Sequence, residues 1–142
     1  VLQEFPTGSV LKPEKNLMVY LKPESGSSYT NFTLSELNSS KTMFSVAKAE
    51  STIQIPTQYL QYDHEYTWTV LLDGKPYRGE FIVSNRDDQH AFETELSSIP
   101  HYQTLTPQAK LLLKAVKAKE WQYSYDMNAA AKQVVVMAGA KR

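Results

Sequence analysis

The stretch Leu60–Val70 constrains the fold of this chain more than any other. Leu60 stands six residues ahead of Tyr66, and from Tyr66 onward large apolar side chains alternate with threonines as far as Val70. Successive side chains of a β-strand point to opposite faces, so the apolar side chains share one face and the threonines the other. This pattern predicts a half-buried strand of an antiparallel β-sandwich, entered through a tight corner.

Residues 1–84 as a whole carry the pattern of short strands separated by turns. Asp73-Gly74 is the best hairpin signal, because both residues tolerate a positive φ, and a second turn is predicted at residues 22–26. No helical pattern separates the strands, which disfavours a parallel α/β sheet. The predicted strands are residues 16–21, 29–34, 41–47, 51–56, 66–72 and 77–83.

Residues 85–142 change to helical periodicity. A first helix is predicted at about 87–99 and ends before Pro100, and a helical hairpin at about 107–137 begins at Thr106 as N-cap and Pro107. The fold class is therefore α+β: an immunoglobulin-like or fibronectin III-like sandwich over 1–84, followed by two to three C-terminal helices. The predicted inward stripe of the second helix is Leu111, Leu112, Ala115 and Val116. For the third helix it is Met127, Ala130, Val134 and Met137, or alternatively Ala131 and Val135.

Composition excludes several classes of function. Fifteen basic and fifteen acidic residues cancel, which argues against a nucleic-acid binder that neutralises phosphates. The absence of cysteine excludes disulfides, thiol catalysis and cysteine-bound metals. No apolar run approaches the roughly 20 residues of a transmembrane helix, so we expect no such segment in this chain.

No motif for catalysis or for a cofactor is present. His64, His90 and His101 lack metal-binding spacing, and the sequence has no serine-nucleophile elbow and no glycine-rich phosphate loop. We therefore expect neither an enzyme nor a cofactor or metal site. The alternative left open is an enzyme with a site assembled from distant residues, for instance around His64 and Glu65.

The corner strand carries a family resemblance. The spacing of Leu60 and Tyr66, the continuation to Val70 and the closing run 79–83 resemble fibronectin type III-like domains, although Tyr62 replaces the family's usual proline. The resemblance covers roughly residues 5–84. It is closest to bacterial extracytoplasmic members, including an uncharacterised family with this sandwich-plus-helices layout. It implies a binding module in the periplasm or at the cell surface, whereas the lack of cysteine is equally compatible with the cytosol.

Two groups in the helical segment are candidates for partner binding. Aromatic side chains dominate interface hot spots, and of the three aromatics near residue 123 we expect Trp121 to pack at the helix corner and Tyr123 or Tyr125 to be exposed. The lysines form a row that is either a solvated face or a contact for an acidic partner or for lipid headgroups. The candidates are Trp121, Tyr123, Tyr125, Lys110, Lys114 and Lys117.

Together these observations favour a non-enzymatic binding or assembly module that presents a sandwich and a helical hairpin for contact with another protein. A carbohydrate-binding accessory domain is the alternative, and it requires a row of exposed aromatic side chains on one sheet face. The outer strand at residues 51–55 offers an edge to a second chain, so a homodimer stays open.

Overall fold

The computed structural model describes residues 5–21, 28–49 and 51–140, and the turn predicted at 22–26 lies outside these ranges. The described residues form seven strands and three α-helices, an α+β fold as predicted. The strands are β1 (Gly8–Val10), β2 (Asn16–Tyr20), β3 (Tyr29–Glu36), β4 (Phe44–Ala49), β5 (Thr52–Pro56), β6 (Glu65–Leu72) and β7 (Lys75–Val83). The helices are α1 (Arg86–Ser97), α2 (Pro107–Glu120) and α3 (Ser124–Ala140).

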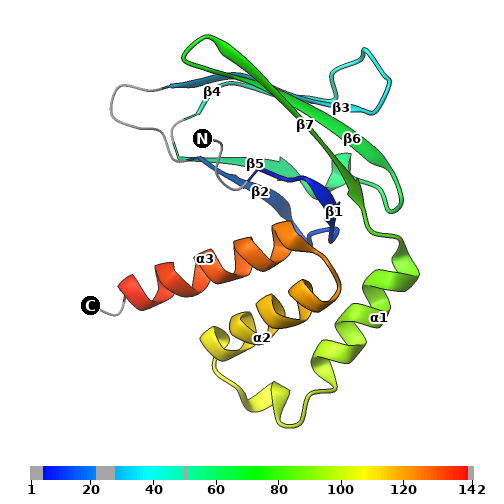
Figure 1. The fold of residues 1–142 in the computed structure, drawn as a ribbon, viewed down its shortest axis with the longest axis vertical. Coiled ribbons are helices and arrows are strands. Elements are labelled where there is room, and N and C mark those ends of the chain that lie inside the picture. The colour runs from blue at the N-terminus through cyan, green and yellow to red at the C-terminus, as the bar shows by residue number, and fades with distance from the viewer. Residues whose placement is uncertain (1–4, 22–27, 50, 141–142) are drawn as a thin grey trace.

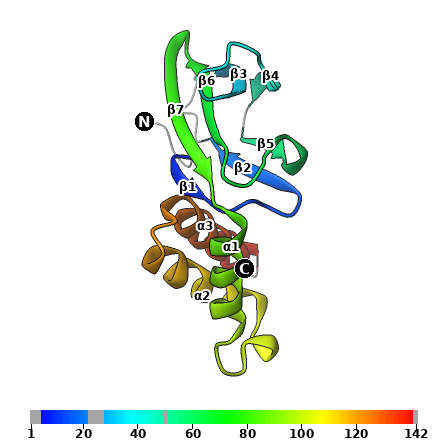
Figure 2. The ribbon, with the colours of Figure 1, turned by 90° about the vertical axis from the view of Figure 1, so that its right-hand side faces the viewer.

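The strands form two sheets that share one core. The larger sheet has the order β1-β7-β6-β3-β4, and the smaller pairs β2 with β5 (Figure 1). The core contains aliphatic side chains of the small sheet, such as Val19 and Ile55, against aromatic side chains of the large one, such as Phe32 and Trp68. Figure 2 shows both sheets on one side of the molecule and the three helices gathered at one end of them.

The predicted corner strand is present as β6. Its alternation is confirmed, because Tyr66, Trp68 and Val70 are almost fully buried. The Tyr66 hydroxyl accepts a hydrogen bond of 2.8 Å from the backbone N–H of Gln61, which is the geometry of a tyrosine corner. Asp73 and Gly74 both have positive φ in the turn between β6 and β7, as that hairpin requires.

The large sheet is mixed rather than purely antiparallel. The short strand β1, which the sequence pattern did not predict, pairs in parallel with β7, with Val10 opposite Val83. Its three residues are too few to show an alternation. The other strands deviate from prediction by one to three residues at their ends, most clearly β4, which begins at Phe44 rather than at residue 41.

The helices begin where the sequence indicated. The Asn85 side chain caps α1 by accepting from the Asp88 N–H, and Thr106 caps α2 with Pro107 in its first turn. The predicted boundary between the two segments falls between the end of β7 at Val83 and this Asn85 cap. The division of the chain into two domains at this boundary stays a prediction.

The inward face of the hairpin differs from prediction. Of the stripe predicted for α2, Leu112 and Val116 are about half exposed, whereas Leu111 and Ala115 lie on the inward side, together with Ala118, which was not predicted. In α3 the first predicted set is correct for Ala130, which is buried, whereas Val135 of the alternative set is 70% exposed. The three consecutive leucines at 111–113 make the apolar stripe of α2 wide, so periodicity alone could not select its buried edge.

Gly79 provides a test of the packing inside the large sheet. A methyl group at this position would overlap the indole ring of Trp68, which is 2% exposed and cannot retreat because its Nε1 donates to the Pro6 carbonyl at 2.7 Å. We expect Gly79→Ala to lower the free energy of unfolding in urea by about 1–3 kcal/mol. Glu80→Ala, one position along β7 with an exposed side chain, is the control and should change it by less than about 0.5 kcal/mol. Equal stability of both variants would contradict the close packing.

Candidate functional site

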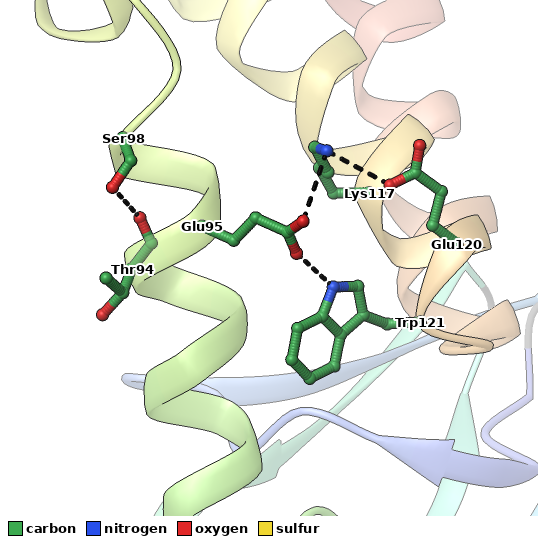
Figure 3. Close-up of polar contacts among 6 residues, drawn as sticks. All are labelled: Thr94, Glu95, Ser98, Lys117, Glu120 and Trp121. Carbon is green, nitrogen blue, oxygen red and sulfur yellow. Dashed lines mark hydrogen bonds and ion pairs between the residues drawn. The ribbon is translucent and has the colours of Figure 1, made fainter.

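Trp121 lies at the corner between α2 and α3, as predicted, and is tied to α1. Its indole Nε1 donates to the Glu95 carboxylate (Figure 3). The other oxygen of Glu95 lies 3.5 Å from Lys117 Nζ, and Lys117 also donates to Glu120 at 3.2 Å. The ring packs edge-on against Phe92 of α1. These contacts make Trp121 a structural link between helices.

The expectation that Tyr123 or Tyr125 is exposed is wrong. Tyr123 is 4% exposed and its hydroxyl lies 2.9 Å from the Ser84 hydroxyl, at the end of the large sheet. Tyr125 is 5% exposed and belongs to the core between the sheets. Both tyrosines are buried because the start of α3 packs against the sandwich, so neither offers a surface to a partner in this conformation.

The three predicted lysines do not form one free basic face. Lys110 Nζ lies over the Tyr102 ring at 5.3 Å from its centroid, and Lys117 is engaged by the two glutamates of the helix corner. Lys114 is half-buried, and its charge acts on the Asp126 carboxyl. Each lysine therefore has a partner within the chain.

The strongest contact between sandwich and helices is made by the backbone of Leu11 and Lys12, which follow β1. The Leu11 N–H donates to the Asp126 carboxylate of α3 at 2.9 Å. The Lys12 N–H donates to the side-chain oxygen of Gln89 of α1 at 2.7 Å, and the Gln89 amide nitrogen donates back to the Lys12 carbonyl at 2.9 Å. We call this set of three hydrogen bonds the backbone clamp. It satisfies buried backbone groups that have no strand to pair with.

A pocket of about 440 Å³ lies beside the clamp, and we call it the junction pocket. Its walls come from the segment before β2, from β2 itself and from all three helices. Its volume is within the range of ligand sites in proteins. Apolar and aromatic side chains form its walls together with eight polar or charged ones. The lining residues named below include Glu14, Asn16, Met18, Tyr20, Gln89, Glu93, Lys114, Tyr125, Asp126, Ala129, Ala130 and Gln133.

Asp126 is the most perturbed acid of the pocket wall. Burial raises the pKa of its carboxyl from 3.8 to about 6, and the Leu11 N–H and the charge of Lys114 offset only part of this effect. A carboxyl that titrates near neutrality in a pocket marks a candidate site, although a structural role alone also perturbs a pKa. Here Asp126 has a defined structural role in the clamp.

Other candidate chemistry is not assembled. His64 Nδ1 lies 3.0 Å from Glu36, and both partners of this pair are 43% exposed. Within residues 5–21, 28–49 and 51–140, no group of three or more histidine or acidic side chains could hold a metal ion. All aromatic side chains are buried or half-buried, so the sheets lack the exposed aromatic row that a sugar-binding face requires.

Comparison with protein families and with curated proteins yields no match. The chain matches no protein-family model, and no curated protein is similar to it. The resemblance to fibronectin type III-like domains therefore stays a prediction, although the tyrosine corner at Tyr66 is the feature on which it was based. In the part of the chain that the structure describes, no helix combines the length and apolar character needed to cross a bilayer.

Sequence reasoning identified two residues of the junction pocket, Lys114 and Tyr125, and missed Asp126 and Gln89. Asp126 lies in the first turn of α3, where an acidic residue complements the helix dipole. Nothing in the sequence distinguishes Gln89 from the other polar residues of an amphipathic helix. Both side chains bond to residues that are far away in the sequence, near the start of the chain, so only the fold brings them to their partners.

Asp126 makes the stability of the protein depend on pH. Because the pKa of this carboxyl is about 6 in the folded protein and 3.8 ordinarily, the folded state binds more protons between these values. The free energy of unfolding should therefore fall as the pH rises from about 4 to 6, by up to roughly 3 kcal/mol from this group. Asp126→Asn keeps an acceptor for Leu11 and removes the titration, so its stability should vary less over this window and exceed that of the wild type at pH 7.

The matched variant Asp126→Ala leaves the buried Leu11 N–H without its acceptor. It should be less stable than Asp126→Asn by about 1–3 kcal/mol. Urea unfolding of the three proteins between about pH 4 and 7.5 measures both effects. An Asn variant whose stability follows the wild-type pH dependence would show that Asp126 does not carry this titration.

Proposed function

We propose that the protein is a non-enzymatic binding module that holds part of another protein in the junction pocket. The observation that carries the proposal is the position of this pocket, between the β2 side of the sandwich and all three helices. Concave pockets of this size are the usual form of binding sites, and this one offers both apolar and polar side chains to a partner. Sandwich and helices therefore contribute jointly to one surface.

The bonding of the buried polar groups in the pocket favours a binding role over catalysis. The polar groups of the pocket that are buried, Asp126 and Gln89, are already bonded to the backbone of Leu11 and Lys12. General acid–base catalysis needs such groups to be directed at a substrate. The aromatic and lysine candidates from the sequence, apart from Lys114 and Tyr125, lie away from the pocket and are not part of the proposal.

The third helix offers a matched pair of variants that tests this function. Ala129 lines the junction pocket, whereas Ala131, two residues later, is exposed on another face of α3. Peptides selected from a random display library on the wild-type protein should lose at least tenfold in affinity for Ala129→Phe, because the ring fills the pocket. They should bind Ala131→Phe as they bind the wild type.

Circular dichroism and thermal unfolding of both variants confirm that they are folded before affinities are compared. A library that yields no binder, or peptides that bind both variants equally, would remove the pocket as the binding surface. Peptides that lose affinity only for Ala131→Phe would transfer the function to the exposed face of the helical hairpin.

A further inference from the structure

We infer that the junction pocket receives its partner as an extended peptide strand, which pairs with the free edge of β2. This inference rests on the proposed function and goes beyond it, because it assigns the backbone geometry and the charge pattern of the partner. It starts from the hydrogen bonds between β2 and β5.

The two strands are antiparallel, with Met18 opposite Gln54. Just outside this ladder, the Leu21 N–H donates to the Ser51 carbonyl at 2.9 Å, and the Thr57 N–H donates to the Lys15 carbonyl at 2.8 Å. Hydrogen-bonded and non-bonded pairs alternate along an antiparallel ladder, so the odd-numbered residues of β2 bond to β5. The residues whose N–H and C=O groups point to the opposite edge are Asn16, Met18 and Tyr20.

This second edge of β2 opens toward the junction pocket. Among the described residues, no strand pairs with it, because the small sheet consists of β2 and β5 alone. The three residues with outward-pointing backbone groups line the pocket, and across it lie Ala129, Ala130 and Gln133 of α3. An exposed row of backbone donors and acceptors is a template for an added strand.

The dimensions of the pocket suit an extended segment. β2 has five residues, which span roughly 17 Å at about 3.3 Å per residue. The facing wall of α3 carries two alanines, whose short side chains keep space beside the edge. A segment of about four to six residues therefore matches the length of the edge.

The two ends of the edge differ in charge. Glu14, just before β2, lines the pocket together with Glu93 of α1. Lys12 also lines it, but its Nζ donates to the Thr57 hydroxyl at 3.2 Å. At the other end, Lys132 Nζ lies 5.1 Å from the centroid of the Tyr20 ring. The charge of Lys114, which also lines the pocket, acts on Asp126. The complementary peptide carries a basic residue beside the two glutamates and an acidic residue beside Lys132, which favours the strand orientation that brings these charges together.

Amide hydrogen exchange on the full chain tests the free edge before any partner is known. The amides of Met18 and Tyr20 should exchange faster than those of Leu17 and Val19, because only the latter pair donates to β5. Equal protection of all four amides in the free protein would overturn the inference, since the edge would then already be paired.

The peptides selected on the wild-type protein supply the second test. On binding, they should slow exchange of the Met18 and Tyr20 amides at least tenfold and leave Leu17 and Val19 unchanged. An added strand bonds to the edge through every second residue. N-methylation of one set of alternate peptide residues should therefore abolish binding, whereas N-methylation of the other set should not.

Two proline variants of the same sheet complete the design. Met18→Pro removes an N–H from the pocket edge, and Gln54→Pro, its cross-strand neighbour, removes one from the outer edge of β5. Neither breaks a backbone hydrogen bond between β2 and β5, although Gln54→Pro removes the exposed side-chain bond from Asn16 Nδ2. We expect at least a tenfold loss of peptide affinity for Met18→Pro and no change for Gln54→Pro. Thermal unfolding shows whether both variants remain folded.

The outcomes separate this inference from the proposed function. Peptides that are sensitive to Ala129→Phe, yet bind Met18→Pro normally without protecting the β2 amides, would leave the function standing and overturn the strand geometry. If Met18→Pro does not fold, the exchange pattern and the N-methylated peptides decide in the same way. A library without binders to the pocket would overturn both proposals.

Discussion

The fold depends on how the backbone of Leu11 and Lys12 is satisfied. The chain leaves β1 there without a neighbouring strand, and Asp126 and Gln89 supply the hydrogen-bond partners that a strand would have supplied. A buried amide without an acceptor would cost about 1–3 kcal/mol. Because the two partners come from different helices, the same bonds fix α1 and α3 against the sandwich, bring Tyr125 into the core and leave the junction pocket between them.

The features that sequence reasoning predicted correctly depend on neighbouring residues. The tyrosine corner joins residues 61 and 66, and the Asp73-Gly74 turn needs two positive φ values. The Thr106 side chain caps α2 by accepting from the N–H of the residue three positions later. In each case residue type and local spacing determine the conformation. The buried face of β6 was predicted correctly for the same reason, because the alternation of side chains depends only on strand geometry.

The features that it missed depend on contacts between distant segments. Asp126 and Leu11 are 115 residues apart, and Gln89 and Lys12 are 77 apart. Periodicity identifies α2 as amphipathic, but its apolar stripe is wide, and the docking direction, not the sequence, decides that Ala118 is buried and Leu112 exposed. The burial of Tyr123 and Tyr125 has the same cause, because their exposure depends on where the clamp places α3.

The clamp also explains how β2 can keep an unpaired edge. Open edges promote aggregation, and two other outer strands carry protection: β4 has Lys48 on its exposed side, and β5 ends at Pro56. The second edge of β2 has no such side chain and instead lies inside the junction pocket, between the clamped helices. The helices that line the junction pocket leave space beside this edge for one extended segment but not for a second sheet. The same helices therefore oppose edge-to-edge stacking and make this edge selective for a single strand.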